Sequence, residues 1–178
     1  MTNDTNAELA YYTHDLGWRV VGMDAGNLDE DDEDEIVVGT WIDDGTYEDW
    51  RNGIVTKNRG HLIILNAGPT PGRFLETELN GDGPIPGSGL GSSVFGVRID
   101  DVDADGQAEI WCGDNLHLYL FRKNGSSWDL AARTDHLGMV PGQYNNIFPI
   151  KDAGGHTVRV VAASSGYVMA FDVDWGAL

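Results

Sequence analysis

The sequence predicts an all-β fold made of repeated four-stranded units. Short apolar runs bounded by Gly, Asn and Asp recur along the chain, which is typical of strands, and no segment has a convincing helical pattern. Similar segments also recur in the same order, and such repetition decides the architecture before any single motif does. With 178 residues, of which 41% are hydrophobic, the chain is long enough for one ordinary domain.

The expected strands follow the same order in each unit. A first β-rich run recurs three times, as EIVVGTW, EIWCG and VRVVAAS. A strand that begins near Gly or Asn follows each of them, as GHLIILNA, NLHLYLFRK and GYVMAFDV. A further strand follows twice, as RFLETELN and SWDLAARTDHLG, whereas the third unit ends at DWGAL. The approximate units are 18–80, 94–138 and 147–178.

The strand missing from the third unit is predicted from the N-terminus. LAYYTHDLG (9–17) resembles LAARTDHLG (130–138), so residues 7–16 are expected to complete the last unit, within the chain or in a partner. Four-stranded repeats of about 50 residues are the unit of a β-propeller, which usually has about four to eight blades. Three blades are too few for that ring. We therefore expect a homodimer, or a part of a larger propeller.

The segment DDVDADGQAEIWCG (100–113) predicts a metal-binding loop. Its acids fall on alternate residues and are followed by Gly106, which suits a sharp left-handed turn. A hard cation such as Ca²⁺ takes six or more oxygens, including a backbone carbonyl and a closing carboxylate. An Asp-rich surface turn is the alternative. The predicted ligands are Asp101, Asp103, Asp105, Gln107 (through its carbonyl) and Glu109.

A second loop, GNLDEDDEDEIVVGTW (26–41), aligns with the first without a gap. Asp32 fills the glycine position, at some conformational cost, so this loop is the weaker prediction. A third copy (147–173) keeps the flanking apolar runs but only Asp152 among the acids. The ligands predicted in the second loop are Asn27, Asp29, Asp31, Glu33 and Glu35.

These loops resemble the calcium-binding FG-GAP and VCBS repeats of integrin-α-like propellers. In that family, D-x-D-x-D-G-x-x-D/E joins the first two strands of a blade and an apolar strand follows. The resemblance covers residues 18–173, with Asn27 in place of the first Asp and Asp32 in place of the Gly. It implies structural Ca²⁺ ions between strands. It implies no single activity, because such propellers serve as adhesion modules, as assembly platforms and, in some polysaccharide lyases, as catalytic domains.

The charge excludes two classes of partner. Asp and Glu number 29 against 11 Lys and Arg, a formal net charge of -18, which disfavours nucleic acid and anionic membranes. The Asp-rich, Lys-poor composition resembles that of proteins from extreme halophiles. No apolar run approaches the roughly 20 residues of a membrane span, and no basic-then-apolar signal peptide begins the chain. The expected location is the cytoplasm of a halophile or an extracellular domain fragment.

An insertion at 42–59 is the candidate ligand-binding segment, because insertions in repeat proteins lie on one face and often bind partners. Its Tyr47, Trp50 and Arg51 suit a protein or glycan surface. The alternative is that Trp50 packs under its own loop.

Two functions are compatible with these features. The first is a non-enzymatic, Ca²⁺-stabilised module that binds protein or glycan or acts as a scaffold. The second is an enzyme of the rhamnogalacturonan lyase type, which needs a base and cationic groups around a uronate. The histidines are scattered and no Ser/His/Asp or Cys/His arrangement is legible, so the binding module is favoured.

Overall fold

The computed structural model describes residues 16, 19–29, 31, 33–41, 60–70, 73–79, 93–114, 117–134, 146–164 and 166–174. Over these residues the chain contains strands and no α-helix, so the all-β prediction is confirmed. No helix in this part of the chain is long and apolar enough to cross a membrane.

The strands form three antiparallel sheets in which neighbours in sequence are neighbours in space. The first sheet contains β1 (Val20–Gly26), β2 (Glu35–Thr40), β3 (Leu62–Ala67) and β4 (Phe74–Glu78). The second contains β5 (Gly96–Asp100), β6 (Glu109–Gly113), β7 (Leu118–Asn124) and β8 (Ser127–Arg133). The third contains β9 (Asn146–Lys151), β10 (Thr157–Ser164) and β11 (Tyr167–Asp172).

The predicted fourth strand of the third sheet, residues 7–16, falls outside the described residues except for Leu16. Among the described strands, β11 therefore has β10 on one side and no strand on the other. The first and second sheets each have the four strands that the repeats predict.

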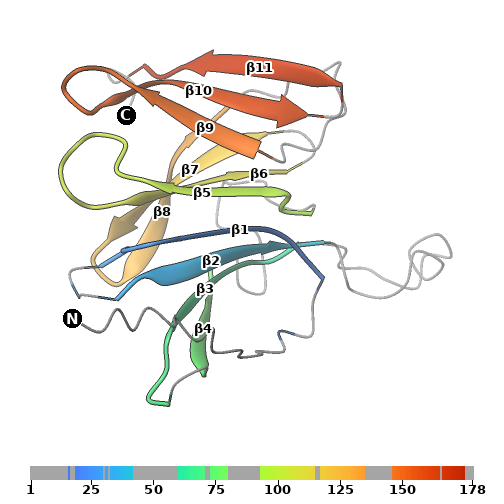
Figure 1. Ribbon diagram of the computed structural model, residues 1–178, viewed down its shortest axis with the longest axis vertical. Coiled ribbons are helices and arrows are strands. Elements are labelled where there is room, and N and C mark those ends of the chain that lie inside the picture. Colours follow the sequence, from blue (N-terminus) through green and yellow to red (C-terminus); the bar gives the residue numbers. More distant parts are fainter. Residues whose placement is uncertain are drawn as a thin grey trace, which may run out of the picture.

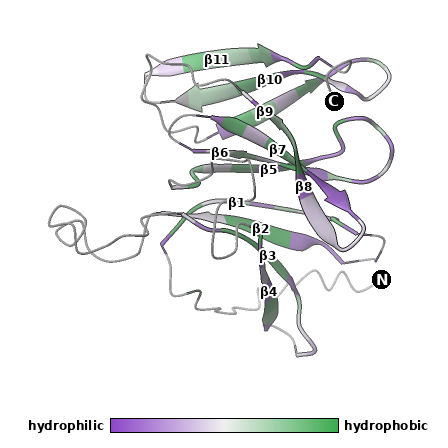
Figure 2. Cartoon of the chain, turned by 180° about the vertical axis from the view of Figure 1, so that it is seen from behind, coloured by the Kyte–Doolittle hydropathy of each residue, from purple (hydrophilic) through white to green (hydrophobic). Residues whose placement is uncertain are grey.

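The sheets lie one above another, with the second in the middle (Figure 1). Their first strands are neighbours, because β5 contacts both β1 and β9. Figure 2, seen from behind, shows hydrophobic residues along the strands of all three sheets. Each sheet thus begins next to the first strand of the sheet before it.

Two apolar cores fill the spaces between the sheets. The core between the first and second sheets includes Val37, Leu62, Ile110 and Phe121. The core between the second and third sheets includes Trp111, Leu120, Ile147 and Val160. Because β residues alternate between faces, the second sheet supplies alternate side chains to the two cores. A smaller cluster on the other face of the first sheet contains Val38, Ile63 and Leu65, with Leu16 packed against it.

Two glycines of the first sheet lie against the backbone of the residues that lead into β5, where a side chain would not fit. A Cβ atom on Gly39 would lie 2.5 Å from the carbonyl oxygen of Val94, and one on Gly22 would lie 2.4 Å from that of Phe95. The Val94 N–H donates to the Thr40 carbonyl at 2.9 Å. The absent side chains allow this backbone contact between sheets.

Candidate metal centre

The two acidic loops occupy the same place in their sheets. The β1–β2 loop follows the pair Gly26–Glu35, and the β5–β6 loop follows the pair Asp100–Glu109. Both closing glutamates are buried, at 3% and 1% exposure. Glu35 accepts the Leu28 N–H at 2.8 Å, and Glu109 accepts the Val102 N–H at 3.0 Å. The closing glutamate of each loop thus holds the equivalent backbone N–H, that of Leu28 or of Val102.

The β5–β6 loop brings three predicted ligands together. One carboxylate oxygen from each of Asp101, Asp103 and Glu109 lies within 4.8 Å of the others. Asp101 also accepts the N–H groups of Asp105 and Gly106, both at 3.1 Å. Gly106 has a φ of 93°, the left-handed turn that the sequence predicts. Backbone hydrogen bonds therefore hold the carboxylates in a tight curve.

The other predicted ligands of this loop lie outside that cluster. The Asp105 carboxylate accepts the Gln107 N–H at 2.8 Å. Asp105 instead lines an open hollow with Asp103. The Gln107 carbonyl is the one ligand of this loop predicted from the backbone, and it stays a prediction.

Arg122, on β7, was not found from the sequence. Its Nη2 donates to Asp103 Oδ2 at 2.7 Å and its Nε donates to Glu109 Oε1 at 3.1 Å. Asp103 Oδ1 is buried and has no hydrogen-bond partner. The guanidinium group therefore neutralises part of the cluster and leaves a carboxylate oxygen unused.

The positions of this ion pair carry different residues in the other sheets. Arg122 follows Phe121, which pairs with Ile110, and the matching residue in the first sheet is Asn66, after the Leu65–Ile36 pair. Asn66 donates to the Leu75 carbonyl at 3.4 Å. The first sheet therefore has a neutral amide where the second has a cation.

In the third sheet the positive and negative residues of the ion pair have exchanged positions. Arg159 stands at the position of Glu109 and Asp172 at the position of Arg122, because Val160 pairs with Phe171 as Ile110 pairs with Phe121. Arg159 Nε donates to Asp172 Oδ1 at 2.6 Å. A cation thus replaces the closing carboxylate of the loop.

The β1–β2 loop forms a second cluster, from Asp29, Asp31 and Glu35, whose oxygens also lie within 4.8 Å of one another. Its alternate side chains accept N–H groups two residues on. Asn27 accepts from Asp29 and Asp29 from Asp31, both at 3.1 Å, and Asp31 accepts from Glu33 at 2.8 Å. The Asn27 amide donates to the Asp31 carbonyl. Asn27 and Glu33 thus shape the loop, while the three carboxylates converge.

Burial raises the pKa of both closing glutamates above the usual value. The Leu28 and Val102 N–H groups oppose the rise, whereas the neighbouring aspartates Asp29, Asp31 and Asp103 add to it. A raised pKa means that the environment disfavours the charged carboxylate. A bound cation would offset that cost at either loop.

The donor set fits a hard cation. Each cluster consists of carboxylate oxygens, the ligands that Ca²⁺ prefers, and contains no histidine or cysteine. The unpartnered Asp103 Oδ1 and the raised pKa of the closing glutamates point in the same direction. The two clusters could therefore hold a metal ion.

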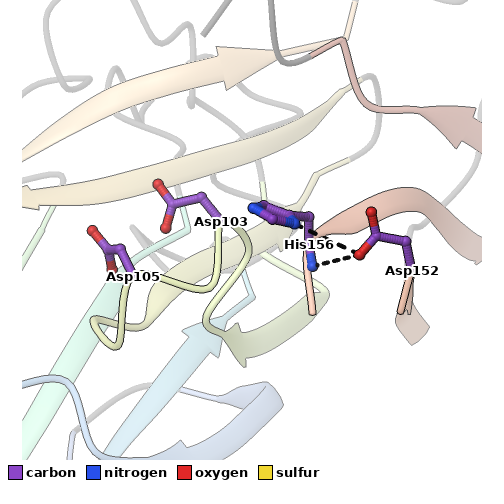
Figure 3. Close-up of a pocket in the computed structure, with 4 residues that line it drawn as sticks. All are labelled: Asp103, Asp105, Asp152 and His156. Atoms are coloured by element: carbon purple, nitrogen blue, oxygen red, sulfur yellow. Dashed lines mark hydrogen bonds and ion pairs between the residues drawn. The ribbon is translucent and has the colours of Figure 1, made fainter. Parts of the chain in front are cut away.

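A hollow lies between the β5–β6 loop and the β9–β10 loop (Figure 3). It is lined by Asp103, Asp105, Asp152 and His156. His156 Nδ1 lies 3.6 Å from Asp152 Oδ1, and both side chains are about half exposed. Asp152 also accepts the Gly154 N–H at 2.8 Å. Asp152, the acid that the third copy retains, thus makes its hydrogen bonds within the β9–β10 turn.

The candidate ligand-binding residues of the insertion, Tyr47, Trp50 and Arg51, fall outside the described residues, as does Asp32 of the β1–β2 loop. A scan against protein-family models found no match to the chain, and a search of curated proteins found none either. The likeness to FG-GAP and VCBS repeats therefore rests on the loop residues themselves.

Proposed function

We propose that the protein is a non-enzymatic module of β-propeller type, stabilised by Ca²⁺, that binds a protein or glycan or serves as a scaffold. The observation that carries the proposal is the repeated closing glutamate. In two loops it is buried, accepts the same N–H and stands beside two further carboxylates. Such a closed set of oxygens suits a structural ion rather than an open catalytic one.

The arrangement of the sheets supports the propeller. Successive antiparallel sheets pack face to face through apolar cores, and their first strands lie next to one another. Both candidate loops join the first and second strands, so they lie at the same end of the strands in their sheets. Blades of a propeller are related in this way.

The proposed partner class rests on composition. Aromatic and basic residues in the 42–59 insertion (Tyr47, Trp50 and Arg51) suit a protein or glycan surface. The lyase alternative would use His156, which shares a hollow with two loop aspartates. Three of the four residues that line this hollow are aspartates, which would repel an anionic uronate. The binding module is therefore the proposal.

Counting the ions tests the proposal. Isothermal titration of the chelator-treated protein with CaCl₂ is expected to give two sites per chain. Asp103→Asn should remove one site and Asp29→Asn the other, because each variant takes a charged ligand from one cluster. Asp129→Asn is the matched control, since Asp129 pairs with Asn124 on β7–β8. An unchanged titration in both loop variants would contradict the proposal.

The acidic composition also supports a halophilic origin, and it gives a separate prediction. With a net charge of -18, KCl at molar concentration should raise the melting temperature by screening self-repulsion. The measurement is thermal unfolding at constant excess Ca²⁺, in dilute buffer and in molar KCl. Equal melting temperatures in the two solutions would remove the argument for a halophile.

A further inference from the structure

We infer that two copies of this chain bind each other through the outer faces of their end sheets, with the third sheet of one copy packed on the first sheet of the other. The inference rests on the repeat arrangement proposed above and does not depend on cation binding. It is argued from positions that are buried inside the stack of sheets and exposed at its two ends.

The outer face of the third sheet repeats a face that is covered elsewhere in the chain. Val168 pairs with Ala163 as Leu118 pairs with Gly113 and Leu62 with Gly39, so Val168, Leu118 and Leu62 are equivalent. Leu62 is fully buried in the core with the second sheet, and Leu118 is 1% exposed in the core with the third. Val168 is 77% exposed. The end sheet thus lacks the neighbour that covers this position twice within the chain.

The exposure of this face extends along β9. Phe148 and Ile150 are 60% and 45% exposed, and Phe148 pairs with Val161, which in turn pairs with Ala170. The alternate residue Ile147 is buried against the second sheet. One face of the third sheet therefore packs within the chain while the opposite face presents an apolar row.

The first sheet shows the converse pattern on its inner strand. Met23 pairs with Val38 as Val97 pairs with Cys112 and Ile147 with Ala162. Val97 and Ile147 pack against the preceding sheet and are 9% and 5% exposed, whereas Met23 is 62% exposed. Met23 is therefore exposed at a position that a preceding sheet covers in the other two sheets.

The contact between inner strands predicts which residues meet. Asp24 of β1 accepts the Ile99 N–H of β5 at 2.8 Å. Phe148 occupies the Asp24 position in the third sheet, since both pair with the equivalent residues Val161 and Val37. The counterpart of Ile99 in the first sheet is Ala25, which is exposed and pairs with Ile36. Phe148 of one copy should therefore approach Ala25 of the other.

A second copy fits these faces better than an unrelated partner. The chain itself presents one face of each kind, and the covered contacts show how two such faces pack. The Arg159–Asp172 ion pair on the third sheet satisfies its own charges, so the apolar row can be covered without leaving them unpaired. Val38, Ile63 and Leu65 of the first sheet are already buried, so the new contact centres on β1. Two copies use each face once and close by a two-fold axis.

Cross-linking between two variants tests the pairing. Phe148→Cys and Ala25→Cys are purified separately, mixed to exchange subunits and treated with a short bis-maleimide. The native Cys112 is fully buried, so it does not compete. The mixture is expected to give a cross-linked dimer, and each variant alone is expected to give none. A dimer from Phe148→Cys alone would instead show third sheets facing each other and would overturn the inference.

Light scattering provides the second measurement. The unaltered protein is expected to be a dimer, and Phe148→Arg should weaken the dimer at least tenfold while its circular dichroism stays unchanged. Leu75→Arg is the control, because Leu75 is 58% exposed on β4, away from both faces. A monomeric unaltered protein, or equal loss in both variants, would contradict the inference. Calcium titration of the same samples is independent, so a failed dimer is distinguishable from failed ion binding.

Discussion

Removing Ca²⁺ is expected to lower the melting temperature of this protein by about 10 to 20 °C. Each site that is filled at about one hundred times its Kd adds about 2.7 kcal/mol to the free energy of unfolding, so two sites add about 5 kcal/mol. For a chain of this length, 1 kcal/mol moves the midpoint by about 2 to 4 °C. The measurement is thermal unfolding with excess CaCl₂ and with excess EGTA at equal ionic strength.

The control for this experiment is the double variant Glu35→Gln, Glu109→Gln. A glutamine oxygen can still accept the Leu28 or Val102 N–H, but the charge that a cation needs is removed. The double variant should therefore fold and should unfold at nearly the same temperature with and without EGTA. If EGTA leaves the midpoint of the unaltered protein unchanged, the two acidic loops are not ion sites.

Arg122→Asn is expected to tighten Ca²⁺ binding at the β5–β6 loop by about tenfold or more, because two unit charges about 4 Å apart interact by about 1 to 4 kcal/mol near a protein surface. The guanidinium group occupies oxygens of Asp103 and Glu109 and repels a second cation. Its removal also leaves the buried Glu109 without a charged partner. In the presence of EGTA, the variant should therefore unfold at a lower temperature than the unaltered protein. Calorimetric titration and thermal unfolding measure the two effects.

Asn66→Arg is the matched variant in the first sheet. It places a guanidinium group at the position of Arg122, beside a loop that now has a neutral amide there. Calcium binding at the β1–β2 loop should weaken, while the affinity of the other loop stays the same. An affinity that moves in the same direction in both variants would show that Arg122 does not compete with the ion.

Much of the fold was predictable because strand patterns and repeats are local. The runs EIVVGTW and EIWCG became β2 and β6, and their closing glutamates lie under the loops as the motif predicts. The convergence of Asp101, Asp103 and Glu109 also follows from spacing, because a tight turn brings alternate residues to one side. These features depend on fewer than ten consecutive residues.

Other parts of the site depend on pairing between strands. Arg122 lies 13 residues after Glu109 and reaches it across the β6–β7 ladder, so only the register places it at the loop. Asp105 has the spacing of a ligand, but its carboxylate accepts the Gln107 N–H and lies outside the cluster. Neither result follows from the motif, because strand pairing places Arg122 and a local hydrogen bond sets the direction of the Asp105 side chain.

The ion pair of the third sheet holds the same two strands together without a closing carboxylate at the loop. Glu109 with Arg122, and Arg159 with Asp172, join the same two positions with their charges exchanged. The exchange preserves attraction between the strands, and it places a positive charge where the second sheet has a carboxylate. The strand pairing of a repeat can therefore be kept while the closing carboxylate is replaced. Covariation at these two positions would therefore distinguish the repeats of related chains that have a closing carboxylate from those that have a cation there.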